Sequence, residues 1–312
     1  VIDSSVDGSR TRVSLQFKPW ESRLITVGRS EAEYNVKKFG VKGNGKVETE
    51  RIQSVIDKAY ASGGGTVVFP AGNYLSGALF FPAGVNLRVG KNAVLKGTAN
   101  PDDYPSVSTR FEGIDRNWRC AFLNFDNSRD VIISGEGTID GNGLEWNRIP
   151  FNGGRPRLIC LTGCEGGSIS GLTLRNQASW CLHLLYSRGF DIKGLNITAK
   201  EYIPSSDGID IDSSSDVHID GCYISVHDDC ISIKSGKDGE GRRVGRPSED
   251  ILIENCHFGY GHGAITMGSE ISGDIRNVTA RNCRVDEDNW APIRFKSQPS
   301  RGGVVENICF EN

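Results

Sequence analysis

The second half of the chain consists of short segments in which apolar and polar residues alternate. Each segment passes through a Gly- or Asn-containing corner into another short run, and successive copies start roughly 22 to 37 residues apart. Strands this short cannot bury an apolar face alone, whereas coils stacked on one another can. The copies occupy 130–141, 167–176, 190–199, 216–225, 250–259, 277–285 and 305–312. This pattern predicts an all-β protein folded as a parallel β-helix (solenoid), since a β-sandwich would need hairpin signals at closer and more regular spacing.

A different pattern precedes the repeats. Residues 49–61 place Ile52, Val55, Ile56 and Ala59 at helical spacing, and glycines at 63–65 end the pattern. Short β-branched and aromatic runs cut by Gly, Pro and Asn follow it. We therefore expect a short helix that caps the N-terminal end of the solenoid core.

The remaining segments suggest the domain boundaries. Residues 1–30 hold one strand-like run, 12–28, which Pro19 interrupts. We interpret 1–30 as an N-terminal extension or the end of a separate β module. We interpret 31–312 as the parallel β-helix catalytic domain. The last run stops inside a coil, so we expect this domain to be C-terminally incomplete.

Composition narrows the class of protein. The formal net charge is −3, so there is no basic excess to attract nucleic acid. No apolar run approaches the roughly 20 residues that span a bilayer. The nine cysteines are an odd number, and Cys222, Cys256 and Cys283 recur at one place in the repeat. We expect most of them to be small buried core residues, so cysteine usage leaves the compartment open.

A second strand in each coil can be aligned by its pair of inward-facing apolar residues. These pairs are Leu182/Leu184, Ile209/Ile211, Ile231/Ile233, Ile265/Met267 and Ile293/Phe295. Neighbouring rungs lie about 4.8 Å apart and side chains alternate in and out. The residues between the pairs then form an outward column, namely His183, Asp210, Ser232, Thr266 and Arg294. The next outward column is Leu185, Asp212, Lys234, Gly268 and Lys296.

Acids, one imidazole and two cations therefore collect on one surface. Asp207, Asp228, Asp229 and His262 stand at the corners just before these strands. Like charges this close raise at least one pKa, and glycoside hydrolysis uses such a set, with one carboxyl as acid and another activating water. Arg294 and Lys296 leave the same strand on the same side, as binding of a sugar carboxylate requires.

At these residues the chain resembles the family-28 glycoside hydrolases, the polygalacturonases and their relatives. That family has Asn-Thr-Asp, Asp-Asp, Gly-His-Gly and Arg-Ile-Lys in this order. The corresponding residues are Ser-Ser-Asp ending at Asp207, His-Asp-Asp at 227–229, Gly-His-Gly around His262 and Arg-Phe-Lys at 294–296. Ser205 and His227 depart from the family pattern, and a family tyrosine would lie beyond residue 312. The resemblance covers roughly residues 34–312.

The resemblance implies a fold and a set of roles. The fold would be a right-handed parallel β-helix, and the reaction an inverting hydrolysis without metal or other cofactor. Asp228 would protonate the leaving oxygen, while Asp207 and Asp229 would position and deprotonate the attacking water. His262 would orient this cluster, and Arg294 and Lys296 would bind the uronate carboxylate at the point of cleavage.

Four further residues are candidates for substrate binding. Asp210 could equally be a solvated turn acid, His183 a packing residue beside the cleft, and Lys234 a ladder residue. Trp290 stands just before the Arg294 strand and is the best candidate for a sugar platform. The segment 236–247 is either a solvated loop or a cleft wall in which Arg242, Arg243 or Arg246 meets an anionic substrate.

The function expected from the sequence is an inverting glycoside hydrolase that cleaves galacturonic-acid-containing bonds in pectin. An insertion at 236–247 and the altered Ser-Ser-Asp favour exo action on rhamnogalacturonan. The alternatives are a non-catalytic β-helical pectin-binding protein and a pectate-lyase-type enzyme, which would need a Ca²⁺ cluster. We expect a pectic polysaccharide or oligosaccharide as partner, a monomer, and a secreted or periplasmic location.

Overall fold

The protein has two compact units. A computed structural model describes residues 2–7, 10–15, 32–149, 154–200 and 202–311. The units are Val1–Glu31 and Ala32–Asn312. In the first unit β1 (Ile2–Asp7) and β2 (Arg10–Leu15) form an antiparallel pair. Most of the strand expected at 12–28 lies outside the described residues.

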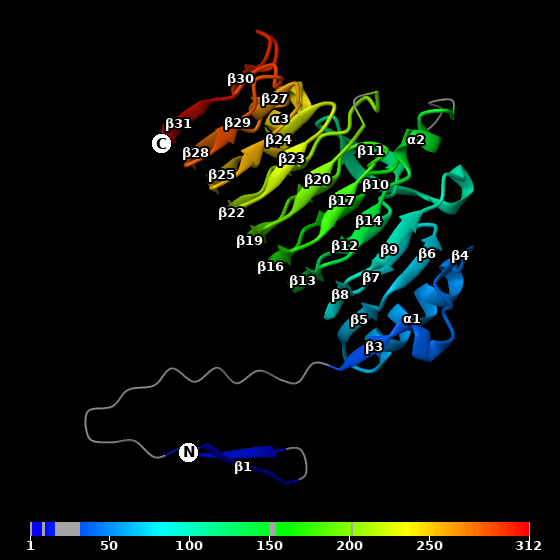
Figure 1. Ribbon diagram of the computed structural model, residues 1–312. Coiled ribbons are helices and arrows are strands. Elements are labelled where there is room, and N and C mark those ends of the chain that lie inside the picture. The colour runs from blue at the N-terminus through cyan, green and yellow to red at the C-terminus, as the bar shows by residue number, and fades with distance from the viewer. Residues whose placement is uncertain (1, 8–9, 16–31, 150–153, 201, 312) are drawn as a thin grey trace. The chain divides into compact units, whose positions relative to one another are not determined.

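The second unit is a right-handed parallel β-helix, as the repeats predicted. Over the described residues its strands form parallel sheets of eight, ten and nine strands (Figure 1), which we call the site sheet, the long sheet and the third sheet. The site sheet contains β7 (Leu79–Phe81), β12 (Leu123–Asp126), β15 (Ile159–Thr162), β18 (Leu182–Leu185), β21 (Ile209–Asp212), β24 (Asp229–Lys234), β27 (Gly263–Gly268) and β30 (Ile293–Lys296).

The other two sheets complete each coil. The long sheet contains β3 (Glu33–Asn35), β5 (Gly65–Phe69), β8 (Val85–Val89), β13 (Arg129–Gly135), β16 (Glu165–Ser170), β19 (Arg188–Lys193), β22 (Ser215–Asp220), β25 (Ser248–Glu254), β28 (Ile275–Arg281) and β31 (Val305–Glu311). The third sheet contains β4 (Asn44–Val47), β6 (Gly72–Ser76), β9 (Ala93–Gly97), β14 (Thr138–Asp140), β17 (Thr173–Arg175), β20 (Asn196–Thr198), β23 (Tyr223–Ser225), β26 (His257–Phe258) and β29 (Arg284–Val285).

The register of the site sheet follows its apolar pairs. Ile209 lies beside Ile231, and Ile231 lies beside Ile265, so each pair stacks on the next. Ile209 and Ile231 are completely buried, and each such side chain contributes about 1.5–3 kcal/mol through burial. On β30, the last rung of this sheet, the inward residues Ile293 and Phe295 are 43% and 60% exposed.

Helices are few among the described residues. The expected cap is α1 (Thr49–Ala61), which buries Ile52, Val55, Ile56 and Ala59 at the blue end of the stack in Figure 1. The other helical segments are η1 (Val36–Phe39), η2 (Pro101–Asp103), α2 (Gly143–Trp146) and α3 (Asp238–Val244). Within the described residues, none of the helices combines the length and apolar character needed to span a bilayer.

Buried serines fix the corner between the site sheet and the long sheet. The hydroxyls of Ser187, Ser214 and Ser248 accept hydrogen bonds from the backbone N–H groups of Cys164, Ser187 and Ser214, at 3.0, 3.0 and 3.2 Å. Each hydroxyl also lies within 3.3 Å of carbonyl oxygens. Buried polar backbone needs such partners, so this ladder locks the coils that carry the acids in register.

The corners between the long and third sheets explain the repeated Gly, Asn and Cys. Gly221, Asn255 and Asn282 adopt positive φ angles of 63°, 54° and 53°, a conformation that Gly and Asn tolerate best. The cysteine that follows each corner turns inward. All nine cysteines, each in the described part of the chain, are free, and seven are buried, which confirms that most are core residues.

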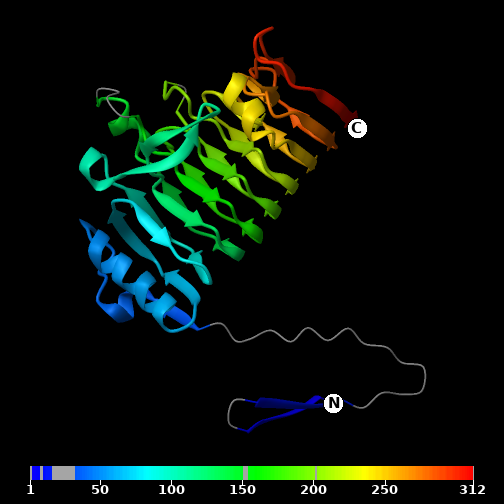
Figure 2. The same ribbon diagram turned by 180° about the vertical axis from the view of Figure 1, so that it is seen from behind.

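An antiparallel hairpin that the repeat pattern did not predict interrupts the stack. It consists of β10 (Ser106–Phe111) and β11 (Ile114–Arg119). Glu112 and Gly113 turn it with φ angles of 50° and 74°, as a two-residue type I′ turn requires. Figure 2 shows the teal hairpin running along the stack toward the yellow α3. The Lys237 N–H donates to the Gly113 carbonyl at 2.9 Å.

The hairpin is tied to the site sheet by a buried ion pair. Arg110 Nη1 lies 3.0 Å from Asp212 Oδ1, and both side chains are completely buried. We expect Arg110→Met to lower the free energy of unfolding in urea by about 3–5 kcal/mol, because it leaves a buried carboxylate without this cation. Arg129→Met, which removes an exposed cation beside Glu165, is the matched control. Equal unfolding midpoints for the two variants would contradict this role of the pair.

Candidate active site

Two successive coils bring three carboxyl groups together. Asp207 stands two residues before β21, Asp228 just before β24, and Asp229 begins β24. Carboxylate oxygens of all three lie within 4.8 Å of one another. A backbone hydrogen bond of 3.0 Å from Gly208 N to the Asp229 carbonyl joins the two coils at this point. Asp207 and Asp229 are buried and Asp228 is partly exposed.

The next coil adds His262 through Gly-His-Gly. Its Nδ1 lies 3.5 Å from Asp228 Oδ1. A Cβ on Gly263 would lie 2.3 Å from Thr266 Oγ1 and 3.1 Å from Asp229 Oδ1. A Cβ on Gly261 would lie 2.7 Å from the sulfur of Cys230. Both glycines are therefore needed for the close approach of this coil to the acids.

Asp229 is a buried carboxylate with compensating partners. Thr266 donates its hydroxyl proton to Asp229 Oδ1 at 2.9 Å. Arg294 Nη1 and Lys296 Nζ lie 3.7 and 3.5 Å from the two carboxylate oxygens. Two cations and a hydroxyl offset the cost of burying a charge. Of the three acids, Asp229 is thus the one with two cations beside its carboxylate.

Asp207 is in the opposite situation. Burial holds its pKa well above the usual range, and the negative charges of Asp210 and Asp228 raise it further. A carboxyl in this environment tends to keep a proton. Since Asp207 and Asp228 belong to one close group, the proton is a property of the group rather than of one side chain.

Apart from Arg294, the first expected outward column lies buried behind these acids. Asp210 is completely buried, and its Oδ1 lies 3.7 Å from Lys234 Nζ. Lys234 also contacts Glu270 Oε2 at 3.2 Å and lies over the ring of Trp180, 4.9 Å from its centre. Burial raises the pKa of Asp210 to about 7, although Lys234 opposes this effect. Asp210 therefore supports the cleft from behind rather than forming its surface.

His183 is also placed away from solvent. It is completely buried, and Arg157 Nη1 lies 2.8 Å from its Nδ1. Because an arginine can only donate, Nδ1 must accept, which leaves the proton on Nε2. Nε2 lies 3.6 Å from Asp212 Oδ2, so its proton faces that carboxylate. His183 thus belongs to a buried network below the cleft. This placement agrees with the alternative prediction that His183 is a packing residue.

Trp290 is well placed for a sugar platform. Its side chain is 65% exposed and stacks on His262, with ring centres 4.0 Å apart and an angle of 27° between the planes. The ring centre of His227 lies 5.3 Å from that of His262. An exposed aromatic face beside the acids suits the apolar face of a sugar ring.

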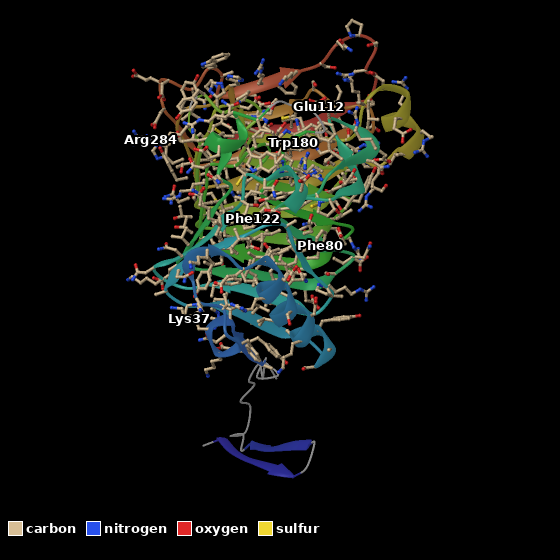
Figure 3. All side chains as sticks on the ribbon, turned by 90° about the vertical axis from the view of Figure 1, so that its right-hand side faces the viewer. Lys37, Phe80, Glu112, Phe122, Trp180 and Arg284 are labelled. Carbon is tan, nitrogen blue, oxygen red and sulfur yellow. The ribbon has the colours of Figure 1, made fainter. Side chains whose placement is uncertain are left out.

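The acids open into a polar cleft of about 290 Å³. Its lining combines acids, lysines and small polar residues, namely Glu112, Trp180, Ser205, Asp207, Asp228, Lys234, Lys237, Ser269, Glu270 and Lys296. Figure 3 shows Glu112 and Trp180 in the same upper part of the stack. The hairpin tip, the start of α3 and Glu270 converge at one end of this cleft, because a Cβ on Gly113 would lie 2.7 Å from Glu270 Cγ and Lys237 Cβ.

Several cleft residues were missed in the sequence. The alternating runs 106–111 and 114–119 around Glu-Gly were an available signal for the hairpin. No local signal tied Glu270 to Lys234. The arginines expected at the wall have other partners in the structure. Arg242 donates to the Arg301 carbonyl, Arg243 pairs with Glu240, and Arg246 donates to the Tyr186 carbonyl.

Two groups in the described chain have the spacing of metal ligands. One is the acid cluster itself, and the other is His218 with Asp220 and Glu254 on the long sheet. In the first group Arg294 and Lys296 already contact Asp229, so a further cation there would meet positive charge. In the second, Asn255 and Arg281 occupy oxygens of Asp220 and Glu254.

The raised pKa of Asp210 gives a prediction about stability. A carboxyl with a pKa of about 7 in the folded state and 3.8 in the unfolded chain contributes stability below pH 4 that is lost as the pH rises through 7. Asp210→Asn removes this titration. Between pH 4 and 8, the free energy of unfolding of Asp210→Asn should rise relative to that of the wild type by a few kcal/mol, because each unit of pKa shift corresponds to about 1.4 kcal/mol. Urea unfolding across this range measures the difference.

The exposed Asp216→Asn is the control for that measurement, since it lies outside this network. Its unfolding midpoint should follow that of the wild type at every pH. A parallel pH profile for Asp210→Asn and wild type would rule out the titration of Asp210.

Comparisons with known proteins identify relatives of this chain. The model of glycosyl hydrolases family 28 matches residues 64–312. A probable polygalacturonase from Vitis vinifera is 35% identical over 288 residues, which cover 86% of this chain and 58% of that protein. An exo-poly-alpha-D-galacturonosidase from Dickeya chrysanthemi is 26% identical over 330 residues, covering 89% and 54%.

A solved structure shows the same architecture. The crystal structure of a hyperthermoactive exopolygalacturonase from Thermotoga maritima superposes with a TM-score of 0.80 at 27% identity, covering 90% of this chain and 75% of that one. The chain spans less than two thirds of the length of the two curated relatives above. On the family match and the similarity to the Vitis vinifera protein, the chain belongs to glycosyl hydrolases family 28.

Proposed function

We propose that this protein hydrolyses galacturonic-acid-containing glycosidic bonds in pectin. The observation that carries the proposal is the group of three carboxyl oxygens within 4.8 Å, with two cations on Asp229 and an open cleft on Asp228. Hydrolysis needs one protonated acid and one ionised base. This group supplies both, because its members have different surroundings.

The roles follow from exposure and charge. Asp228 faces the cleft and donates a proton to the leaving oxygen as the glycosidic bond breaks. Asp229, with Asp207 beside it, accepts a proton from the water that attacks the anomeric carbon. His262 contacts Asp228 and orients it. The pKa of Asp207 is raised, so Asp207 tends to hold the proton. For Asp228 to act as the acid, that proton must be shared between the two carboxyl groups.

We also propose that the enzyme removes sugars from chain ends. The hairpin tip, the start of α3 and Glu270 converge at one end of the cleft, and a closed groove admits a terminal residue but no continuing chain. The names of the Dickeya chrysanthemi and Thermotoga maritima relatives describe exo-acting enzymes. Galacturonic acid linked to rhamnose would fit the same end, so rhamnogalacturonan belongs among the substrates tested.

Product analysis tests the reaction and the mode of attack. Wild type and Asp228→Asn are incubated with polygalacturonic acid and with rhamnogalacturonan oligosaccharides. We expect the wild type to release saturated galacturonic acid as the monomer, and the variant to lose about 10²–10⁴-fold in rate because its acid is gone. Products are separated by size and read for ultraviolet absorbance.

The other outcomes of this assay each exclude a part of the proposal. A ladder of oligomers would mean endo action. Absorbance from an unsaturated product, dependent on Ca²⁺, would mean a lyase. Binding of the polymer by both proteins without any release would mean a pectin-binding β-helix.

Stereochemistry is a separate prediction. Inverting enzymes usually separate their carboxyls by about 6.5–9.5 Å, whereas closer carboxyls are typical of retaining enzymes. In this cluster the oxygens lie within 4.8 Å of one another. A carboxylate can act as a base or as a nucleophile, so the expectation rests on the resemblance to the family-28 glycoside hydrolases, which implies inversion. We therefore expect inversion, with proton NMR showing the product anomer opposite to that of the substrate bond. Initial formation of the same anomer would overturn it.

A further inference from the structure

The cations that line the cleft differ in their partners. Lys234 is held by Glu270 and Asp210 at 3.2 and 3.7 Å. Lys296 lies 3.5 Å from Asp229. Lys237 also lines the cleft, yet within the described residues its ammonium group has no acidic partner within 4.0 Å. A partly buried cation without a counter-ion is available for an anion that enters from solvent.

The backbone of Lys237 is fixed more firmly than that of a loop residue. Its N–H donates to the Gly113 carbonyl at 2.9 Å, and its own carbonyl accepts from Gly241 N at 2.9 Å. The following N–H, of Asp238, donates to Ser272 Oγ at 2.7 Å. These bonds hold the lysine where α3 meets the hairpin tip, so its stem projects from a rigid support.

Lys237 lies at the end of the cleft where the hairpin tip, α3 and Glu270 meet, which is the closed end in the proposed exo-acting enzyme. Gly113 packs against it so tightly that a Cβ would lie 2.7 Å from Lys237 Cβ. The acids Asp207 and Asp228 line the same cleft. A sugar whose bond lies at Asp228 and whose ring fills the closed end would therefore bring its far substituents to Lys237. In a uronic acid, one of those substituents is a carboxylate.

We propose that Lys237 binds the carboxylate of the terminal uronic acid at the non-reducing end of the substrate. This inference rests on the proposed exo-acting function and names the group that the closed end recognises. Glu112 stands at the hairpin tip on the same cleft and offers carboxylate oxygens to the sugar hydroxyls. The ligand class is an oligosaccharide that ends in a uronic acid, whether the next sugar is acidic or neutral.

Binding experiments test Lys237 independently of catalysis. Titration calorimetry with galacturonic acid and with galactose compares wild type, Lys237→Met and Lys237→Arg. We expect the wild type to prefer galacturonic acid, and Lys237→Met to lose about tenfold in affinity for it with no change for galactose. The loss of a single charge-assisted hydrogen bond lowers affinity by this order or more. Lys237→Arg should retain most of the preference.

Arg243→Met is the matched control, because it removes an exposed cation from the same helix that is paired with Glu240. It should bind both sugars as the wild type does. If Arg243→Met lost as much affinity for galacturonic acid as Lys237→Met, the effect would come from the overall positive charge of this region rather than from Lys237. The proposal would then be wrong. Equal loss of both sugars in Lys237→Met would also overturn it, since that would indicate a structural role.

Kinetics separate this inference from the proposed function. On an oligogalacturonate with a free terminal carboxylate, kcat/KM of Lys237→Met should fall about tenfold or more. On the same oligomer with that terminal carboxyl reduced to the alcohol, the two proteins should be equal. An inert wild type would refute the proposed hydrolysis and leave the calorimetry to decide on Lys237. An active enzyme with unchanged Lys237→Met kinetics would refute Lys237 alone.

Discussion

In-register parallel stacking is the constraint on which the rest of this structure depends. Because Ile209, Ile231 and Ile265 lie beside one another on successive rungs, the residues around them occupy equivalent places in each coil. Rungs are about 4.8 Å apart, so corner acids of adjacent coils cannot avoid each other. The burial of the apolar pairs therefore supplies the free energy that holds Asp207 and Asp229 together. No flexible loop would keep like charges at this distance without such support.

The same spacing makes neighbouring acids chemically different. Asp229 meets Thr266 on the next rung and Arg294 on the one after it, whereas Asp207 meets mainly other carboxyls. Burial by itself disfavours ionisation of every one of them. The cations on one side of the cluster and the acids on the other therefore decide which carboxyl keeps a proton. The proposed acid and base functions would therefore arise from the position of each aspartate in the stack rather than from the type of side chain.

The sequence was sufficient to predict the stacked coils of the β-helix, but it did not predict the hairpin that covers them. Repeated apolar pairs predict the register, since a shift by one residue would turn every Ile of β21 and β24 to the wrong face. They say nothing about the environment of the outward residues. Asp212 is buried because the hairpin, about a hundred residues earlier in the chain, folds over it. Long-range docking of this kind depends on pairs such as Arg110 with Asp212, and no local period reveals them.

The hairpin thus affects both the burial of the charges behind the cleft and the shape of the cleft itself. Its strand β10 buries Asp212 through Arg110, and Phe111 stacks on Trp180 at 4.7 Å, which keeps water from the charges behind the cleft. Its tip, at Gly113, meets α3 and Glu270 at one end of the cleft. One element therefore both covers the buried charges and shapes the cleft. In the proposed exo-acting enzyme, a hairpin altered to lengthen the cleft would also expose Asp212 to water, so chain-end specificity and the strength of the buried ion pair would change together.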